Sequence, residues 1–208
     1  MEEVLAVYQR PFDPTHPVIC MDESSKQLVS ETRVSLPAEP GQPRREDYEY
    51  ERHGVANLFL FCEPLAGWRE IQVTERRTRT DWAGVMRELS DQHYPAAERI
   101  TVVLDNLNTH GPASFYEAFA PEEARRLAER FAFHYTPKHG SWLNMAEIEL
   151  SVLNRQCLDR RIGEATVLQQ EIEAWQQKRN AASKIINWQF TAVDARIKRK
   201  RLYPVIQT

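Results

Sequence analysis

The sequence predicts an α/β domain in which a mixed β-sheet is flanked by helices. Three observations lead to this prediction: apolar runs alternate with turn-forming residues in the first half, the apolar period becomes helical near Thr80, and apolar runs then alternate with helical segments. Strands joined by short turns pair antiparallel, whereas strands separated by helices form parallel βαβ units. We therefore expect three antiparallel strands followed by βαβ units, in one domain of 208 residues.

The N-terminal half supplies the antiparallel strands. Four runs have strand character: 17–22, 27–34, 55–62 and 68–74. Residues 1–16 form an N-terminal extension ahead of the first strand. Residues 36–54 contain three prolines, two glycines and dense charge, so they are predicted to be a loop excursion. The sequence Glu-Pro-Leu-Ala-Gly separates the last two runs and has the composition of a turn.

The C-terminal half supplies the βαβ units. Helices are predicted at 80–94, 121–130, 144–158 and 166–180, and strands at 99–105 and 131–135. The last helix places Val167, Leu168, Ile172 and Trp175 on one face. We expect residues 17–162 to form the α/β domain and residues 163–208 to form a helical, basic segment packed on the same domain.

Charge is unevenly distributed along the chain. The whole sequence has 27 basic and 30 acidic residues, which by itself argues against a histone-like DNA-binding protein. Residues 151–208, however, contain 11 basic and 5 acidic residues. The densest run of cations is Arg196, Lys198, Arg199, Lys200 and Arg201. This run has two interpretations, a solvated basic tail or a contact with nucleic-acid phosphates.

Targeting signals and cysteine chemistry indicate a cytoplasmic protein. The N-terminus has no basic region followed by an apolar run, and no segment approaches the ~18 apolar residues of a membrane span. Cys20, Cys62 and Cys157 are far apart and odd in number, which favours buried thiols over disulfides or a zinc site.

Two aspartates end apolar runs of strand character, Asp22 and Asp105. If their strands are neighbours, the two carboxylates converge, and a divalent cation such as Mg²⁺ would relieve their repulsion. The alternative for each aspartate is a turn residue at the end of a strand.

A third acid, Glu147, follows the last predicted strand. Asn144 and Glu147 also have the spacing of a capping box, so Glu147 could simply close the start of its helix. Glu149 competes with it as the third acid. It lies about 200° further round the helix, so only one of the two can face the sheet.

Taken together, the segments 20–24 (CMDES), 102–110 (VVLDNLNTH) and 135–147 (YTPKHGSWLNMAE) resemble the DDE transposases, and most closely the bacterial insertion-sequence branch of the Tc/mariner superfamily. The segment 187–204 (NWQFTAVDARIKRKRLYP) resembles the end of such proteins. The resemblance covers nearly all of residues 17–205.

The resemblance implies an RNase H-like fold with Asp22, Asp105 and Glu147 as the catalytic and metal-binding triad. It also implies two Mg²⁺ or Mn²⁺ ions and in-line displacement at phosphorus, with one site performing strand cleavage and strand transfer. The partner would be double-stranded DNA, with a TA dinucleotide as target. The assembly would be a homodimer on paired DNA ends, associated with the bacterial nucleoid.

Several neighbouring residues receive roles from the same resemblance. Asn106 and His110 are expected to orient the substrate or a metal ligand. Contacts with DNA are expected from the loop residues and the C-terminal cations: Lys138, His139, Trp142, Arg196, Lys198, Arg199, Lys200 and Arg201. The alternative for Lys138, His139 and Trp142 is an ordinary polar loop. Arg76, Arg77 and Arg79 either touch DNA or form a solvated connection.

Asp22 lies too close to the start for a helix-turn-helix module to precede it. We therefore expect a catalytic domain alone, or part of a split or truncated element. Two alternatives remain open: an RNase H-like nuclease that only hydrolyses DNA, and a truncated regulator that binds a full-length transposase.

Overall fold

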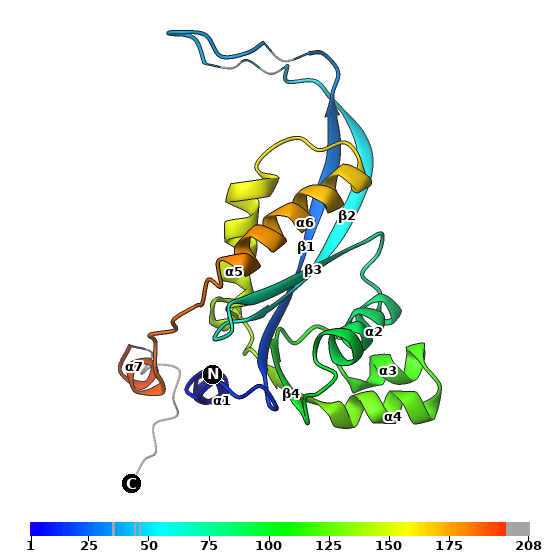
Figure 1. Ribbon diagram of the computed structural model, residues 1–208, viewed down its shortest axis with the longest axis vertical. Coiled ribbons are helices and arrows are strands. Elements are labelled where there is room, and N and C mark those ends of the chain that lie inside the picture. The colour runs from blue at the N-terminus through cyan, green and yellow to red at the C-terminus, as the bar shows by residue number, and fades with distance from the viewer. Residues whose placement is uncertain (35, 44, 46, 199–208) are drawn as a thin grey trace.

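The computed structural model describes residues 1–34, 36–43, 45 and 47–198. These residues form one five-stranded sheet in the order β3-β2-β1-β4-β5 (Figure 1). The strands are β1 (Val18–Glu31), β2 (Tyr50–Glu63), β3 (Trp68–Thr74), β4 (Ile100–Leu104) and β5 (Phe131–Tyr135). The first three pair antiparallel, and β4 pairs parallel with both β1 and β5. The predicted mixed sheet of an antiparallel meander followed by βαβ units is confirmed.

Helices cover both faces of the sheet. They are α1 (Glu2–Tyr8), α2 (Arg79–Glu88), α3 (Pro112–Ala118), α4 (Pro121–Arg130), α5 (Ala146–Leu153), α6 (Ala165–Ala181) and α7 (Ala192–Lys198). Because side chains alternate along a strand, Ile19 and Met21 of β1 pack in the core with α2, α3 and α4, whereas Cys20 packs with α1, α5 and α6. The sheet is therefore buried on both sides near β4, as parallel strands require.

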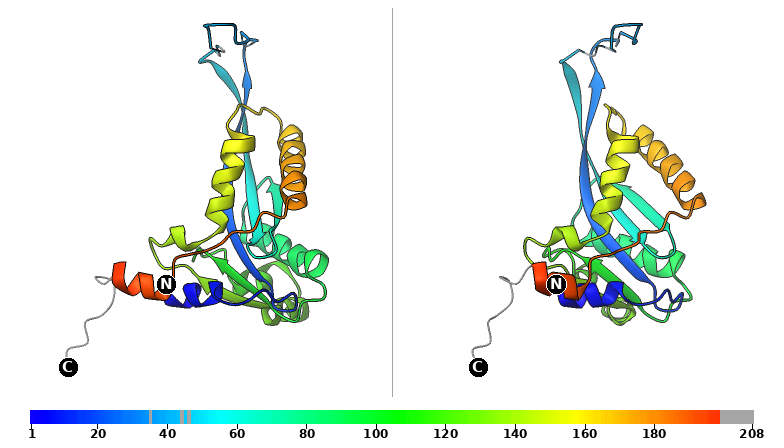
Figure 2. Two further views of the ribbon diagram at one scale, coloured as in Figure 1. Left: turned by 60° about the vertical axis from the view of Figure 1, so that its left-hand side comes forward. Right: turned by 90° about the vertical axis from the view of Figure 1, so that its left-hand side faces the viewer.

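The first two predicted strands, 17–22 and 27–34, are wrong as separate elements. They are one strand, β1, paired with β2 from Cys20↔Cys62 to Glu31↔Tyr50 with an irregularity between Gln27 and Val29. The predicted excursion at 36–54 is therefore too long by the five residues that open β2. Figure 2 shows the outer part of this hairpin projecting from the body as an arm. Its polar, exposed residues carry no core pattern, so the strand could not be traced from hydrophobicity.

The remaining elements match the predictions to different degrees. The helix 121–130 and the strands 68–74 and 131–135 have the predicted bounds, whereas α1 and α3 were not predicted. The helices predicted at 80–94 and 144–158 are α-helical only in their first part and end in wider π-type turns, Leu89–His93 and Asn154–Leu158. On α6, Leu168 and Ile172 are buried as expected, but Val167 is 41% exposed.

The β3 edge of the sheet is closed by side chains of α6. The amide of Asn180 accepts a hydrogen bond from the Arg69 N–H (2.9 Å) and donates one to the Arg69 carbonyl (2.8 Å). Gln176 accepts another from the Ile71 N–H (2.8 Å). An unpaired strand edge is a template for aggregation, and these bonds satisfy its backbone groups.

A buried ion-pair network joins the same edge to α5. Glu149 is fully buried and accepts hydrogen bonds from Arg69 (2.8 and 2.9 Å) and Arg179 (2.7 and 2.9 Å). Burial raises the pKa of Glu149, but the hydrogen bonds and charges of the two arginines outweigh it and hold the pKa below its ordinary value. The network therefore stabilises the fold at pH values above the ordinary pKa of glutamate. This stabilisation is lost as the pH falls through the lowered pKa that Glu149 has in the folded state.

No helix among the described residues is long and apolar enough to cross a membrane. Cys20, Cys62 and Cys157 are buried free thiols, as predicted.

We predict that Glu149→Ala lowers the free energy of unfolding by about 3–5 kcal/mol, because it leaves two arginines without their buried partner. The matched control is Glu147→Ala, in the same helix turn, which should change it by about 0.5 kcal/mol or less. Urea denaturation followed by tryptophan fluorescence measures both. Equal losses of unfolding free energy in the two variants would contradict the stabilising role of Glu149.

Candidate active site

Two aspartates meet where β4 ends beside β1. The parallel pairing of these strands runs from Val18↔Thr101 to Cys20↔Val103. Continuing this register by two residues places Asp22 opposite Asp105, on the face of the sheet that also carries Cys20. Asp105 follows the last residue of β4, as predicted. Asp22 does not end a strand, because β1 continues past it into the arm.

Glu147 lies in the first turn of α5, on the same face of the sheet. The predicted capping box is not formed, since the α5 N-cap is Met145 and makes no side-chain cap hydrogen bond. The Asn144 side chain, which is buried, accepts from the Ala146 N–H with its Oδ1 (3.1 Å), and its Nδ2 donates to the Met21 carbonyl (2.8 Å) and to Asp22 Oδ2 (3.3 Å). Asn144 therefore ties the start of the helix that carries Glu147 to the strand that carries Asp22.

Glu149 is excluded as the third acid of this site. Both of its carboxylate oxygens are engaged by Arg69 and Arg179 on the β3 side of α5. Glu147 is half-buried, and its negative charge helps to raise the pKa of Asp22. The opposite orientations of the two glutamates agree with their angular separation on the helix.

The three carboxylates influence one another electrostatically. Burial is the largest cause that raises the pKa of Asp22, and together with the charges of Asp105 and Glu147 it brings that pKa to about 6. The Glu23 N–H, which donates to Asp22 Oδ1 (2.8 Å), opposes this rise. The site therefore concentrates negative charge that the protein itself only partly compensates.

His110 is bound between two acids. Its Nδ1 lies 2.6 Å from Asp105 Oδ1 and its Nε2 lies 2.7 Å from Glu23 Oε1. Although burial lowers the pKa of His110, the hydrogen bonds and charges of the two carboxylates raise it to about 9. The imidazole is therefore a cation at neutral pH, in direct contact with Asp105.

Three loop residues near the acids, one predicted to position the substrate and two predicted to contact DNA, are exposed. Asn106, Lys138 and His139 lie at the surface, on the segments that follow β4 and β5. Gly140 allows this second loop to turn back tightly, because a Cβ atom there would lie 2.6 Å from the Pro137 ring. Trp142 is 39% exposed and its ring meets Phe190 edge-on at 5.5 Å.

Two of the C-terminal cations, Arg196 and Lys198, lie in the described part of the chain. Arg196 of α7 forms an ion pair with Glu2 of α1 (2.7 Å). Lys198 is exposed, with its Nζ 5.6 Å from the centre of the Phe190 ring. Arg199, Lys200 and Arg201 lie outside the described residues.

The three arginines between β3 and α2 differ in their contacts. Arg76 is exposed. Arg77 Nη1 lies 3.8 Å from Glu23 Oε2, which places this side chain beside the acids. Arg79 forms a surface ion pair with Glu117 (3.1 Å) and is directed to α3.

Sequence reasoning missed Glu23 and the bridging role of Asn144. The only local signal for Glu23 was its position directly after Asp22, and nothing local indicated that it would meet a histidine 87 residues away. For Asn144 the sequence indicated only a bond to its own helix, because a cap is the commonest use of asparagine at that position, and the second bond to β1 was missed.

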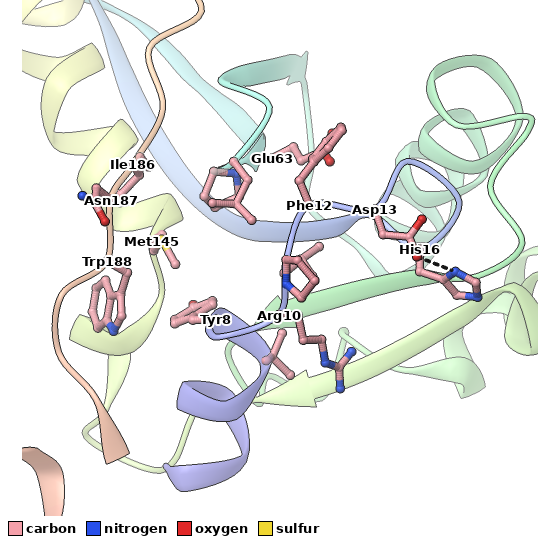
Figure 3. Close-up of a pocket in the computed structure, with 15 residues that line it drawn as sticks. Tyr8, Arg10, Phe12, Asp13, His16, Glu63, Met145, Ile186, Asn187 and Trp188 are labelled. Atoms are coloured by element: carbon pink, nitrogen blue, oxygen red, sulfur yellow. Dashed lines mark hydrogen bonds and ion pairs between the residues drawn. The ribbon is translucent and has the colours of Figure 1, made fainter. Parts of the chain in front are cut away.

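A separate cavity of about 80 Å³ lies between the segment after α1, the β2–β3 turn and residues 186–188 (Figure 3). Tyr8, Phe12 and Trp188 give it an apolar wall, and Glu63 contributes a carboxylate. None of the three acids of the sheet edge is among its described lining residues.

The acids at the sheet edge offer hard oxygen ligands, the kind that Mg²⁺ and Mn²⁺ prefer. Among the residues that the structure describes, no three His, Cys, Asp or Glu side chains form a preassembled metal-binding group. Asp105 is one-third exposed, so its carboxylate can be reached from solvent.

We predict that Asp22→Asn gains stability relative to the wild type as the pH rises from 4 to 7 without divalent cations. A raised carboxyl pKa in the folded state means that the wild type loses stability over this range, by on the order of 1–3 kcal/mol, and the amide does not. Urea midpoints at several pH values measure the difference, with the exposed Asp159→Asn as control. A difference that does not depend on pH would contradict the raised pKa.

Comparison with known proteins identifies a family. The family model of the DDE superfamily endonucleases (DDE_3) matches residues 17–169, a span that contains Asp22, Asp105 and Glu147. Comparison with curated proteins finds no match.

Three solved structures share the fold. They are the Mos1 mariner paired end complex with Mn (16% identity, TM-score 0.55), the Mos1 transposase paired-end complex with left transposon end (15%, 0.56) and the Mos1 strand transfer complex (14%, 0.52). These matches cover 88%, 88% and 90% of this chain but only 55%, 55% and 60% of the Mos1 chains. The chain thus spans little more than half the length of these relatives.

The comparisons confirm two expectations drawn from the motifs, the RNase H-like fold and the DDE family. The family model covers well over half of the sequence, from the start of β1 into α6. This chain belongs to the DDE superfamily of endonucleases.

Proposed function

We propose that this chain is the catalytic domain of a transposase of the Tc/mariner type, which cuts DNA strands and joins the resulting ends to a target in a metal-dependent reaction. The observation that carries the proposal is the placement of Asp22 opposite Asp105, with Glu147 close enough for its charge to raise the pKa of Asp22. A family of DNA endonucleases and a fold shared with Mos1 transposase complexes support it.

Asp22, Asp105 and Glu147 would hold the divalent ions, Mg²⁺ or Mn²⁺ and two in number. The fit rests on donor chemistry, since the site presents hard carboxylate oxygens whose mutual repulsion a cation would relieve. When bound, the ions would supply activation of an attacking hydroxyl and stabilisation of the leaving oxygen. Because the three side chains are not preassembled as one ligand group, binding would require their carboxylates to move closer.

The other residues around the site would position rather than react. His110 fixes one oxygen of Asp105, and Asn144 holds the start of α5 against β1. No group among the three acids needs to form a covalent bond with DNA, because the attacking oxygen comes from water or from a DNA 3′-hydroxyl. One site could then perform both hydrolysis and joining.

Double-stranded DNA would approach over the exposed loops beside the acids. Asn106, Lys138, His139 and Trp142 lie at this surface and could contact phosphate or base. The basic C-terminal residues would add contacts with the backbone. Arg196 would have to exchange Glu2 for phosphate to take part. A homodimer on paired ends, a TA target and association with a bacterial nucleoid complete the proposal.

We predict that Asp105→Ala abolishes metal-dependent nicking of duplex DNA, by on the order of 10³-fold, because it removes a ligand worth several kcal/mol to the transition state. The fold should persist, since Asp105 lies beyond the end of β4 and is one-third exposed. Gel-based nicking assays in Mg²⁺ and Mn²⁺ measure the loss, with Asp159→Ala as a matched surface control. Equal nicking by wild type and Asp105→Ala would remove the catalytic assignment.

A second experiment separates transposition from its two alternatives. Given a duplex end with a free 3′-hydroxyl and a TA-containing target, the wild type should join the two, and Glu147→Gln should not. Joined product measured on a sequencing gel supports strand transfer. Hydrolysis without joining would indicate a nuclease, and DNA binding without either reaction would indicate a regulator.

A further inference from the structure

One residue outside the three acids is connected to two of them, once through its backbone and once through its side chain. Glu23 follows Asp22 in β1 and is directed to the opposite face of the sheet, where its carboxylate reaches His110 Nε2 at 2.7 Å. Its own N–H donates to Asp22 Oδ1 at 2.8 Å. Through its backbone Glu23 therefore contacts one acid of the site, and through His110 it reaches the other.

The imidazole between Glu23 and Asp105 is held rigidly. Its ring is stacked on Trp82 at 5.7 Å with an interplanar angle of 28°, and its side chain has no solvent exposure. The Tyr135 hydroxyl donates to the His110 carbonyl (2.9 Å), which fixes the backbone as well. A ring held in this way transmits the position of Glu23 to Asp105.

The hydrogen bonds leave little choice of orientation. Both ring nitrogens face carboxylate oxygens, which only accept, so both nitrogens donate. His110 engages Oδ1 of Asp105 and so restrains the orientation of that carboxylate. The Glu23 side chain is 5% exposed, and its second oxygen lies 3.8 Å from Arg77 Nη1.

We propose that Glu23 is a positioning residue, which orients Asp105 through His110 and Asp22 through its own N–H, and so sets the arrangement of the two carboxylates toward a divalent cation. The inference rests on the proposed function, because it assigns a role toward the metal ions of that site. A purely structural role would predict lost stability without a change in metal affinity. The experiment therefore measures Mn²⁺ binding directly, without DNA and without turnover.

The variants are Glu23→Ala, which removes the contact with His110, and Glu23→Gln, whose amide can accept from or donate to the ring at the same reach. Loss of a residue that orients a metal ligand typically weakens metal affinity 10–100-fold. We expect Glu23→Ala to weaken Mn²⁺ binding at least 10-fold and Glu23→Gln to stay within about threefold of the wild type. Electron paramagnetic resonance of free Mn²⁺ during titration of the full chain gives both values.

The matched control is Glu63→Ala. Glu63 is another buried glutamate of the sheet, and its carboxylate accepts a hydrogen bond from the Tyr94 hydroxyl (2.8 Å) away from the acids. The Glu63→Ala variant should lose as much unfolding free energy in urea as Glu23→Ala does, and it should keep the Mn²⁺ affinity of the wild type. The N–H proton resonances of His110 should be lost in Glu23→Ala and retained in the Glu63 variant.

The outcomes distinguish this inference from the proposed function. If Asp105→Ala abolishes Mn²⁺ binding while Glu23→Ala binds as the wild type does, the positioning role is overturned and the proposed function stands. Equal weakening in Glu23→Gln and Glu23→Ala also overturns it. If the wild type binds no Mn²⁺, or Asp22→Ala and Asp105→Ala bind as well as it does, the proposed metal site and the inference fail together.

Discussion

The short parallel pairing between β1 and β4 is the constraint on which the site depends. Three residue pairs, from Val18↔Thr101 to Cys20↔Val103, are enough to fix the register, and the register places Asp22 opposite Asp105. A slip by one residue would send either aspartate to the other face of the sheet. The buried alternation of β1 and β4 prevents this slip, because both faces are packed against helices. The core is thus what holds two like charges together.

The two glutamates of α5 show how the fold separates stability from chemistry. Glu149 is neutralised twice, by Arg69 and Arg179, and anchors the helix to β3. Glu147 remains half-buried near Asp22, where its charge raises the pKa of that aspartate. The ion pairs of Glu149 on one side of the helix stabilise the fold, and this offsets the repulsion between Glu147 and Asp22 on the other side. Uncompensated charge at this edge lowers stability there, as is common at functional sites, and it agrees with the proposed cation site.

Much of the fold could be predicted because its core segments are strongly patterned. β3, α4 and β5 have the predicted bounds, since each has a clear apolar period and recognisable end signals. The hairpin arm could not be predicted as one strand, because its outer residues pair through backbone hydrogen bonds and bury no apolar face. The short helices α1 and α3 were missed for a related reason, since seven residues give too few turns for a period to be read.

The sequence by itself determined the family, the candidate acids and their order, because these depend on residue types at fixed spacing. It left Glu147 and Glu149 as rivals and gave Asn144 to its own helix. Tertiary structure decided between the two glutamates, because Arg69 and Arg179, 80 and 30 residues away along the chain, bind Glu149. Asn144 gained a second partner, since its Nδ2 donates to β1 while its Oδ1 accepts from the first residue of α5. Tertiary structure also brought Glu23 to His110, which lies 87 residues further on. Local sequence specifies which groups are present, whereas long-range packing decides which charges meet, because electrostatic partners depend on distance in space.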